Sequence, residues 1–253
     1  MKNFLREFFA SFLGTIIGIL GLVGIIFIIL LISGPQAPKT KVNSVLYLSF
    51  SKPIPELTNN NDKSGSSLDF ANIFEEQIGL HDILKLIDLA KEDENIKGIY
   101  LDLKSAPGGF ATMKKIREHI EDFKESGKFV IAYSTAYSQK QYYLASAAEK
   151  LYIHPMGGID FMGFAAQIMY YKGLMDKVGV KVQIYYAGKF KSATEPFRRT
   201  NMSEANRKQV SEYIGGAYRQ YLEVIGESRG ISADSLFGIA DNARLRNASD
   251  AVK

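Results

Sequence analysis

The chain contains no cysteine among its 253 residues, and this absence excludes disulfide bonds, thiol catalysis and zinc–thiolate sites. Histidine is scarce as well: His81, His119 and His154 are widely separated and follow no metal-ligand spacing. The net charge of +4 is too small to indicate a nucleic-acid partner. We therefore expect no metal, no cofactor and no bound nucleic acid.

Charge is also missing from one long stretch near the N-terminus. Residues 12–32, "FLGTIIGILGLVGIIFIILLI", carry no charged side chain. A helix of this length rises about 30 Å, enough to cross the hydrocarbon core of a bilayer. A cleaved signal peptide has a shorter apolar region and a small-x-small cleavage site, and "SGPQAPKTK" offers no convincing one. We predict an uncleaved transmembrane anchor, with a tail at 1–11 before it and a linker at 33–43 after it.

Basic residues flank this anchor on both sides. Lys2 and Arg6 precede it, and Lys39 and Lys41 follow it, so the positive-inside rule barely discriminates between the two orientations. A short N-terminal tail and a large C-terminal domain favour an N-terminus inside the cytoplasm. We expect the domain from about residue 40 onward to lie outside it.

Residues 44–253 alternate short apolar runs with amphipathic segments, which predicts an α/β domain with a parallel sheet. Strands are expected at 44–50, 96–103, 129–134 and 150–155, with a further strand-like run at 181–187. Helices are expected at 80–93, 112–127, 141–149 and 203–228. In the first of these helices five apolar residues share one face: Leu80, Ile83, Leu84, Ile87 and Ala90.

Three loops carry residue types that suit chemistry. "SAPGGF", residues 105–110, follows a strand and precedes a helix, so it is either an ordinary tight turn or one whose N–H groups face an oxyanion. Ser138 starts a helix and is either its cap or a nucleophile. "GKFKSATEPFRRT", residues 188–200, offers Lys189 and Lys191 as solvated charges or as a base.

The order of these segments resembles the signal peptide peptidase A family, which are membrane-anchored serine–lysine proteases of bacteria. The likeness lies in "IYLDLKSAPGGF", in "GKFVIAYSTAYSQKQYYLASAAEKLYIHPMGGIDFMGF" and in "YKGLMDKVGVKVQIYYAGKFKSATEPF". Its most specific part is the Lys-Ser-Ala-x-Glu-Pro-Phe block, and the chain is most similar to the N-terminal half of the long, two-repeat form. The resemblance implies a ClpP/crotonase-like fold of repeated ββα units, preceded by one transmembrane helix.

The resemblance also implies a serine–lysine dyad. A lysine amine has an ordinary pKa near 10.4, and burial lowers it by disfavouring the charged form. The neutral amine can then take the proton of a serine hydroxyl. The family motif places this general base at Lys191, with Ser192 as a neighbour that supports it by hydrogen bonding. It does not place the base at Lys189.

The nucleophile of the family lies in a small-Ser-Gly-Gly-Tyr pattern. When that pattern is aligned on Tyr142, its serine falls on Gln139 and its glycines on Lys140 and Gln141, whereas a slip of one residue would bring in Ser138. The resemblance therefore implies that this repeat supplies the lysine and that a C-terminal repeat, missing here, supplies the serine. We expect the chain to be truncated and inactive in isolation, and "SAPGGF" to be a remnant of the oxyanion turn.

Two functions from different classes remain open. The first is a serine–lysine endopeptidase of the bacterial inner membrane, which degrades cleaved signal peptides and other membrane-released peptides on the periplasmic side. It would contact the lipid bilayer and assemble as a homo-oligomer. The second is a catalytically incomplete scaffold or binding module of the same fold. A crotonase-type acyl-CoA enzyme ranks third, because neither the anchor nor Lys191 suits it.

Overall fold

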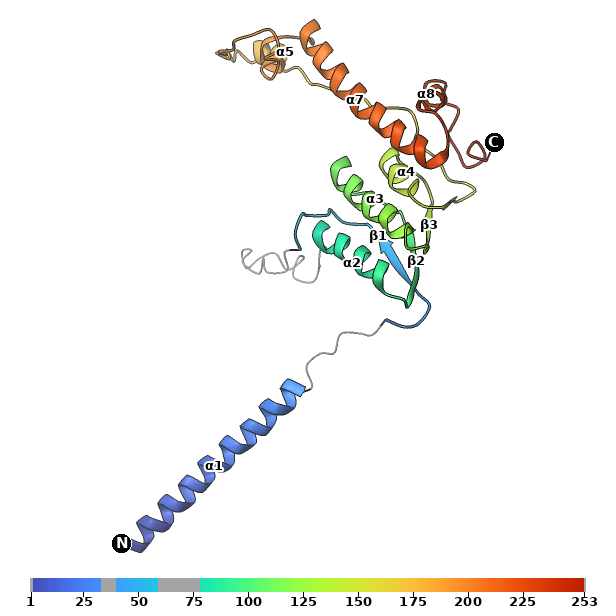
Figure 1. Cartoon of the computed structure of the whole chain (residues 1–253). Coiled ribbons are helices and arrows are strands. Elements are labelled where there is room, and N and C mark those ends of the chain that lie inside the picture. The colour runs from blue at the N-terminus through green and yellow to red at the C-terminus, as the bar shows by residue number, and fades with distance from the viewer. Residues whose placement is uncertain (1, 33–39, 59–77, 253) are drawn as a thin grey trace. The chain divides into compact units, whose positions relative to one another are not determined.

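The computed structural model describes residues 2–32, 40–58 and 78–252 (Figure 1). The chain forms two compact units, Met1–Lys41 and Val42–Lys253, and each is described by itself. Most of the predicted linker at 33–43 lies outside the described residues, and so does the segment 59–77.

The N-terminal unit contains one helix, α1 (Lys2–Ile32). Within it, the 19 residues Phe8–Ile26 have a mean hydropathy of 2.4, and none of this stretch is buried. By length and composition it could cross a membrane, although a signal sequence has the same properties. The helix begins at Lys2, so it includes residues 2–11, which were expected to form a tail before the anchor.

The second unit contains a parallel sheet in the order β1-β2-β3-β4. Its strands are β1 (Ser44–Ser49), β2 (Ile96–Asp102), β3 (Phe129–Ser134) and β4 (Lys150–Ile153). One helix lies in each crossover: α2 (Leu80–Glu92), α3 (Phe110–Lys124) and α4 (Gln139–Ala145). This alternation confirms the predicted α/β class and all four strands expected between residues 44 and 155.

The core lies between the sheet and these helices because each presents an apolar face of the right period. In α2 the expected face is buried at Leu80, Ile83, Ile87 and Ala90, whereas Leu84 is only half-buried. The side chains with no exposed surface include Ile99 and Leu101 of β2, Val130 and Ala132 of β3, and Met113, Ile116, Ile120 and Phe123 of α3. Burial of each large apolar side chain contributes about 1.5–3 kcal/mol, so this layer contributes strongly to the stability of the unit.

The long predicted helix near the C-terminus is confirmed as α7 (Glu204–Arg229). Ser203 caps it by accepting a hydrogen bond from the Asn206 N–H, and Gly230 ends it in the left-handed conformation, φ 66°, which glycine adopts without steric cost. The C-terminal half of α7 packs on α4, where the Tyr221 and Tyr143 rings stack 6.0 Å apart. The chain then continues into α8 (Ala233–Asp241).

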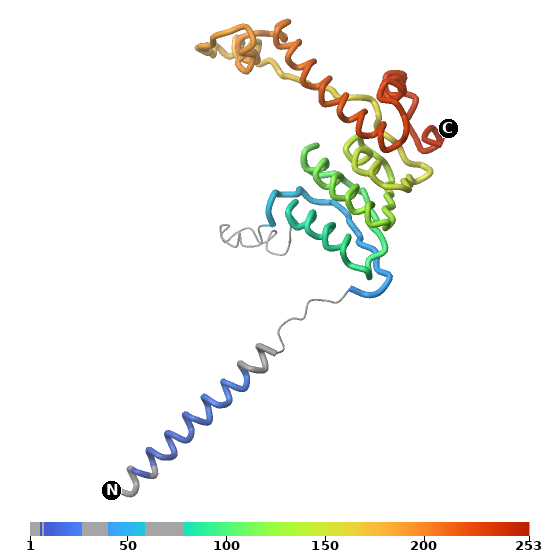
Figure 2. Tube along the Cα trace, in the orientation of Figure 1, coloured from blue at the N-terminus to red at the C-terminus, as the bar shows by residue number. Residues whose placement is uncertain are grey.

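Between β4 and α7 the chain has little regular structure, as the trace in Figure 2 shows. The described elements here are two short helices, α5 (Lys172–Lys177) and α6 (Glu195–Arg198). The strand-like run predicted at 181–187 is wrong: no strand is present there. A strand needs a neighbour to pair its backbone N–H and C=O groups, and no described segment forms a ladder with residues 181–187.

Candidate active site

The segment that follows β2 is hydrogen-bonded to the end of β3 and to the start of α4 at the carboxyl edge of the sheet. The Ser134 hydroxyl donates to the Leu103 carbonyl over 2.7 Å, and the Gln141 side-chain amide donates to the same oxygen over 2.7 Å. In parallel α/β sheets this edge is where ligand sites form. A further bond, from Lys140 to Gly108, brings "SAPGGF" and the start of α4 together, although they are about thirty residues apart in the sequence.

The "SAPGGF" turn has the strand–turn–helix setting that the sequence predicts. Gly108 has a φ of 110°, which a residue with a side chain rarely adopts, and Gly109 directly precedes α3 without a side-chain cap. The Lys140 amine donates to the Gly108 carbonyl over 2.9 Å. A lysine at the position expected for a family glycine therefore reaches across and holds this turn.

Ser138 is the N-cap of α4. Its hydroxyl accepts from the Gln141 backbone N–H, and its own N–H donates to the Gln141 side chain over 2.8 Å, which completes a capping box. Of the two interpretations left open by the sequence, the helix cap is the one that the structure shows.

Gln139, at the position expected for the nucleophile, is the first residue of α4. Its side-chain NH₂ donates to the Gly163 carbonyl over 2.7 Å, and its oxygen accepts from the Gly163 N–H over 3.2 Å. Both ends of the amide are therefore used to fix the chain near Gly163. The position offers no hydroxyl for acyl transfer.

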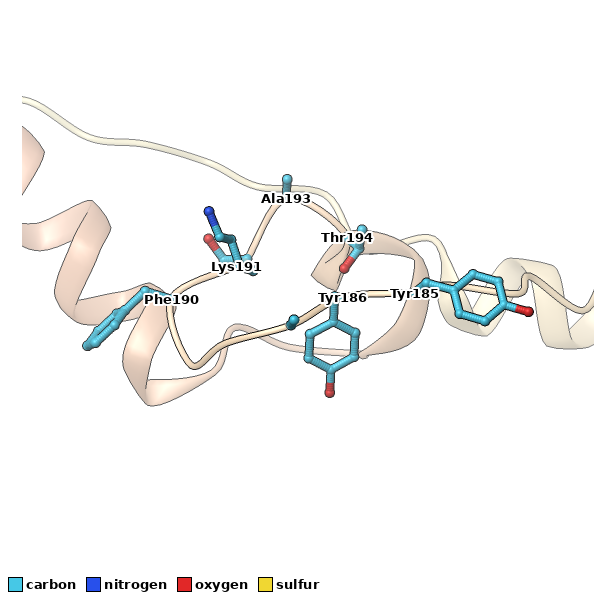
Figure 3. A pocket seen from close by; sticks show the side chains of 8 residues that line it. Tyr185, Tyr186, Phe190, Lys191, Ala193 and Thr194 are labelled. Atoms are coloured by element: carbon cyan, nitrogen blue, oxygen red, sulfur yellow. The ribbon is translucent and has the colours of Figure 1, made fainter.

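Lys191 lies in the loop that leads into α6, where it lines an open pocket of ≈ 590 Å³. The lining residues all come from one segment: Tyr185, Tyr186, Ala187, Phe190, Lys191, Ser192, Ala193 and Thr194. In Figure 3 the labelled side chains point in different directions, and the Lys191 amine lies clear of the aromatic rings. Lys191 is exposed, and its amine has no hydrogen-bond or ion-pair partner among the described residues. The burial that a base lysine needs is not provided by this part of the chain.

Ser192 was expected to hydrogen-bond to Lys191, and the structure shows a different partner. The Ser192 hydroxyl donates to the side-chain oxygen of Gln209 on α7 over 3.3 Å. The loop runs beside the first turns of this helix, so the hydroxyl meets an acceptor there. Ser192 connects the loop to α7.

Glu195 is a buried carboxylate whose contacts the sequence does not reveal. Its side chain is only 2% exposed, and one carboxylate oxygen accepts from the Ser203 N–H over 3.1 Å and from the Asn206 side chain over 3.0 Å. Burial by itself raises the pKa of Glu195, but the hydrogen bonds from Ser203 and Asn206 and the nearby Arg198 outweigh it and hold this pKa below its ordinary value. The sequence shows Glu195 as part of the Lys-Ser-Ala-x-Glu-Pro-Phe block, eight residues before a helix cap, but not that it is buried against that helix.

Lys191, predicted as the general base, and Gln139, at the position equivalent to the nucleophile, share no side-chain contact or pocket among the described residues. The side-chain contacts of Gln139 are with Gly163, whereas the pocket around Lys191 is lined only by residues between 185 and 194. In the described structure, the loop with Lys191 and the N-terminus of α4, which carries no nucleophile, are therefore two separate features.

The sequence matches peptidase family S49 over residues 122–253, slightly more than half of the chain. Over 159 residues it is 44% identical to a protein named Protease 4 of Salmonella typhi, which covers 62% of this chain and 26% of that protein. It is 36% identical over 161 residues to Protease 4 of Haemophilus influenzae, covering 63% of this chain and 26% of that protein. It is 32% identical over 141 residues to "Serine protease SPPA, chloroplastic" of Arabidopsis thaliana, covering 56% of this chain and 21% of that protein.

The match spans about a quarter of the length of these curated relatives. The match to the family, over residues 122–253, includes α4 with Gln139 and the loop with Lys191. Together with the parallel sheet, the match confirms the predicted ClpP/crotonase-like α/β fold. The chain belongs to peptidase family S49.

Proposed function

We propose that this chain is the lysine-supplying part of a membrane-anchored serine–lysine peptidase that degrades cleaved signal peptides. The observation that carries the proposal is the position of Lys191. It stands in the Lys-Ser-Ala-x-Glu-Pro-Phe block, inside the region that matches peptidase family S49, on a loop attached to α7. No histidine occurs in this block to act as a base instead.

The proposed reaction is acyl transfer. The neutral Lys191 amine takes the proton of a serine hydroxyl while the serine oxygen bonds to the scissile carbonyl carbon. When the peptide C–N bond breaks, the protonated amine gives that proton to the leaving nitrogen. Water, deprotonated by the same amine, then hydrolyses the acyl-enzyme and restores the serine.

We place the serine outside residues 1–253. Gln139 has no hydroxyl, Ser138 caps α4, and Ser192 is bonded to Gln209. The relatives, about four times as long as the matched region, have room for a second repeat. The exposed rings of Tyr185 and Phe190 beside Lys191 offer apolar surface on which a second repeat or another copy of the chain could pack, and such a contact would exclude water from the amine.

The helix α1 supports the proposed substrate and location. An apolar stretch at Phe8–Ile26 supports attachment to the inner membrane, with the α/β unit on the periplasmic side. Signal peptides that remain in a bilayer are themselves apolar helices. An enzyme attached by a similar helix shares their surroundings, so contact with the lipid bilayer is part of this proposal.

The alternative is a catalytically incomplete scaffold or binding module at the membrane. One observation favours it: the position of the nucleophile is filled by Gln139, whose amide NH₂ and oxygen are both hydrogen-bonded to Gly163. Under this alternative the exposed residues around Lys191 bind a partner and no peptide is cleaved by any assembly that contains the chain.

The deciding experiment replaces Lys191 in the full-length protein. Lys191→Arg is expected to abolish peptidase activity, because a guanidinium keeps its proton near neutral pH. Lys189→Arg is the matched control, since Lys189 is two residues away and exposed, and it should stay close to wild type. Full activity of Lys191→Arg would remove this lysine from the mechanism.

A serine-reactive fluorophosphonate probe tests the second half of the proposal. Residues 1–253 alone should neither react with it nor hydrolyse peptides. Labelling at Ser138, lost together with peptidase activity in Ser138→Ala, would show that this repeat is an enzyme by itself.

A further inference from the structure

Glu195 is the first buried residue after a long exposed stretch. From Met162 to Thr194 the structure buries no residue at all, and then Glu195 is buried to 2% exposure. A carboxylate is costly to remove from water unless it is hydrogen-bonded, so its burial in place of an apolar side chain needs a reason. Glu195 lies four residues after Lys191, in the same loop-and-turn segment.

The contacts of Glu195 attach this segment to the N-terminus of α7. One carboxylate oxygen accepts from the Ser203 N–H and from the Asn206 side chain, while the other lies 3.5 Å from the Arg198 guanidinium. The N-terminal end of a helix carries positive partial charge and stabilises a carboxylate. Both the position and the charge of Glu195 therefore suit the start of this 26-residue helix.

The loop that carries Lys191 is held at further points around Glu195. The Arg198 guanidinium stacks on the Tyr186 ring at 3.9 Å and donates to the Thr194 hydroxyl over 3.2 Å. The Glu195 N–H donates to the Ser192 carbonyl over 2.9 Å, which closes a turn one residue after Lys191. Polar contacts thus define the path of the chain on both sides of the lysine.

The large apolar side chains beside Lys191 do not hold the loop by packing in a core. Tyr185 is 92% exposed and Phe190 is 51% exposed, so the large side chains next to Lys191 are not packed in a core. The orientation of the loop depends on its polar contacts, and among the described residues of that loop Glu195 is the one that is buried.

We propose that Glu195 is a positioning residue that fixes the Lys191 loop to the start of α7 and so determines where the lysine amine lies during the reaction. This rests on the proposed function of Lys191 as the general base. Glu195 does not touch the substrate. It acts through Lys191, and misplacing a catalytic group by about 1 Å can cost on the order of 100-fold in rate.

The first test, in the full-length protein, compares the buried carboxylate of Glu195, which contacts the start of α7, with the exposed carboxylate of Glu204 in the first turn of that helix. Glu195→Ala is expected to lower kcat on the order of 100-fold with little change in KM, because substrate binding does not depend on the lysine geometry. Glu204→Ala is the control: Glu204 lies in the first turn of α7, the helix end that Glu195 contacts, but it is exposed, and kcat should stay close to wild type. Equal effects of the two variants would overturn the proposal.

The second test exchanges the donor and the acceptor. Asn206→Asp places two carboxylates side by side and should lower kcat. Adding Glu195→Gln restores the pair with the roles exchanged: the amide at position 195 donates and the carboxylate at position 206 accepts. The double variant should recover at least about tenfold in kcat over Asn206→Asp alone. These variants keep the side-chain sizes, so they decide the matter even if Glu195→Ala does not fold. Failure of the double variant to recover kcat, when circular dichroism shows it to be folded, would count against Glu195 as a positioning residue.

Two further measurements separate this proposal from the one on which it rests. If Lys191→Arg is inactive while folded Glu195→Ala keeps wild-type kcat, positioning is wrong and the proposed function stands. If Lys191→Arg is fully active, the proposed function fails, and hydrogen exchange still tests the structural part. The amides of residues 186–203 should then exchange faster in Glu195→Ala than in Glu204→Ala, and equal exchange in the two variants would overturn it.

Discussion

Two regions of the α/β unit contain many large apolar residues, but one region buries them and the other leaves them largely exposed. In the sheet and its crossover helices, residues such as Ile99, Met113 and Phe123 have no exposed surface. In the segment from Met162 to Thr194, residues such as Met169, Tyr185 and Phe190 are more than half exposed, and none is buried. The sheet region is stabilised by its own residues. In the segment with the candidate base, Phe164 packs on the core, but most of the other large apolar side chains remain exposed.

This difference agrees with the proposed half-site. A region that provides its own core can fold as a unit, but an amine that must become neutral needs a second surface to exclude water. Among the described residues, no second surface covers the Lys191 amine. The predicted homo-oligomer and the proposed serine-bearing repeat are two ways to provide that surface.

The largest expected effect contrasts one phenylalanine from each region. Phe123→Ala should lower the free energy of unfolding by about 3–5 kcal/mol, because it leaves a cavity in a fully buried site. Phe190→Ala removes the same atoms from an exposed position and should change it by less than about 0.5 kcal/mol. Urea denaturation followed by circular dichroism measures both. A loss at Phe190 as large as that at Phe123 would mean that the loop is packed in solution and that the two regions do not differ.

The next effect concerns Arg117, which joins the sheet region to α7. Its side chain is 2% exposed and donates to the Tyr143 carbonyl, to the Ser146 hydroxyl over 2.8 Å and to the Ser228 hydroxyl. Burial lowers the pKa of this guanidinium, and Glu121, at 2.9 Å, offsets part of that effect. Arg117→Met should lower the free energy of unfolding by about 2 kcal/mol, because buried acceptors lose their donor.

Lys115→Met on the same helix is the control for Arg117. Lys115 pairs with Glu118 at the surface, where its side chain is 59% exposed, and exposed ion pairs contribute little. Thermal melts of the two variants should differ clearly. If they coincide, Arg117 does not hold α7 to the sheet region.

The smallest effect is a pH dependence at Glu195. Because its pKa is lower in the folded protein than in the unfolded chain, the carboxylate contributes stability above the unfolded pKa of about 4.3. This contribution is lost as the pH falls through the lower folded pKa. The stability difference between wild type and Glu195→Gln should therefore be larger at pH 7 than at pH 3, as measured by urea denaturation. An equal difference at both pH values would show that the charge of Glu195 does not stabilise its contacts.

Much of the sheet region could be predicted from the sequence because its elements follow their own periodicity. The runs that became β1 to β4 and the apolar faces of α2 and α3 are local patterns, and the structure places them as expected. The strand predicted at 181–187 was wrong because a strand also depends on a pairing partner. "KVQIYYA" has the composition of a strand, but no described neighbour pairs with it. The sequence also did not predict the hydrogen bond from Ser192 to Gln209, because Gln209 lies seventeen residues away and only the fold brings it close.

The sequence by itself determined the α/β class, the apolar helix near the N-terminus, the positions of Lys191 and Gln139 in family motifs, and the absence of thiol chemistry. These depend on residue type and on short spacings, which the chain carries wherever it folds. Only the tertiary structure decided that Gln139 is bonded to Gly163, that Lys140 holds Gly108, and that Glu195 is buried against Ser203 and Asn206. Those contacts join residues from different elements, and a hydrogen bond depends on distances and angles that no local pattern specifies.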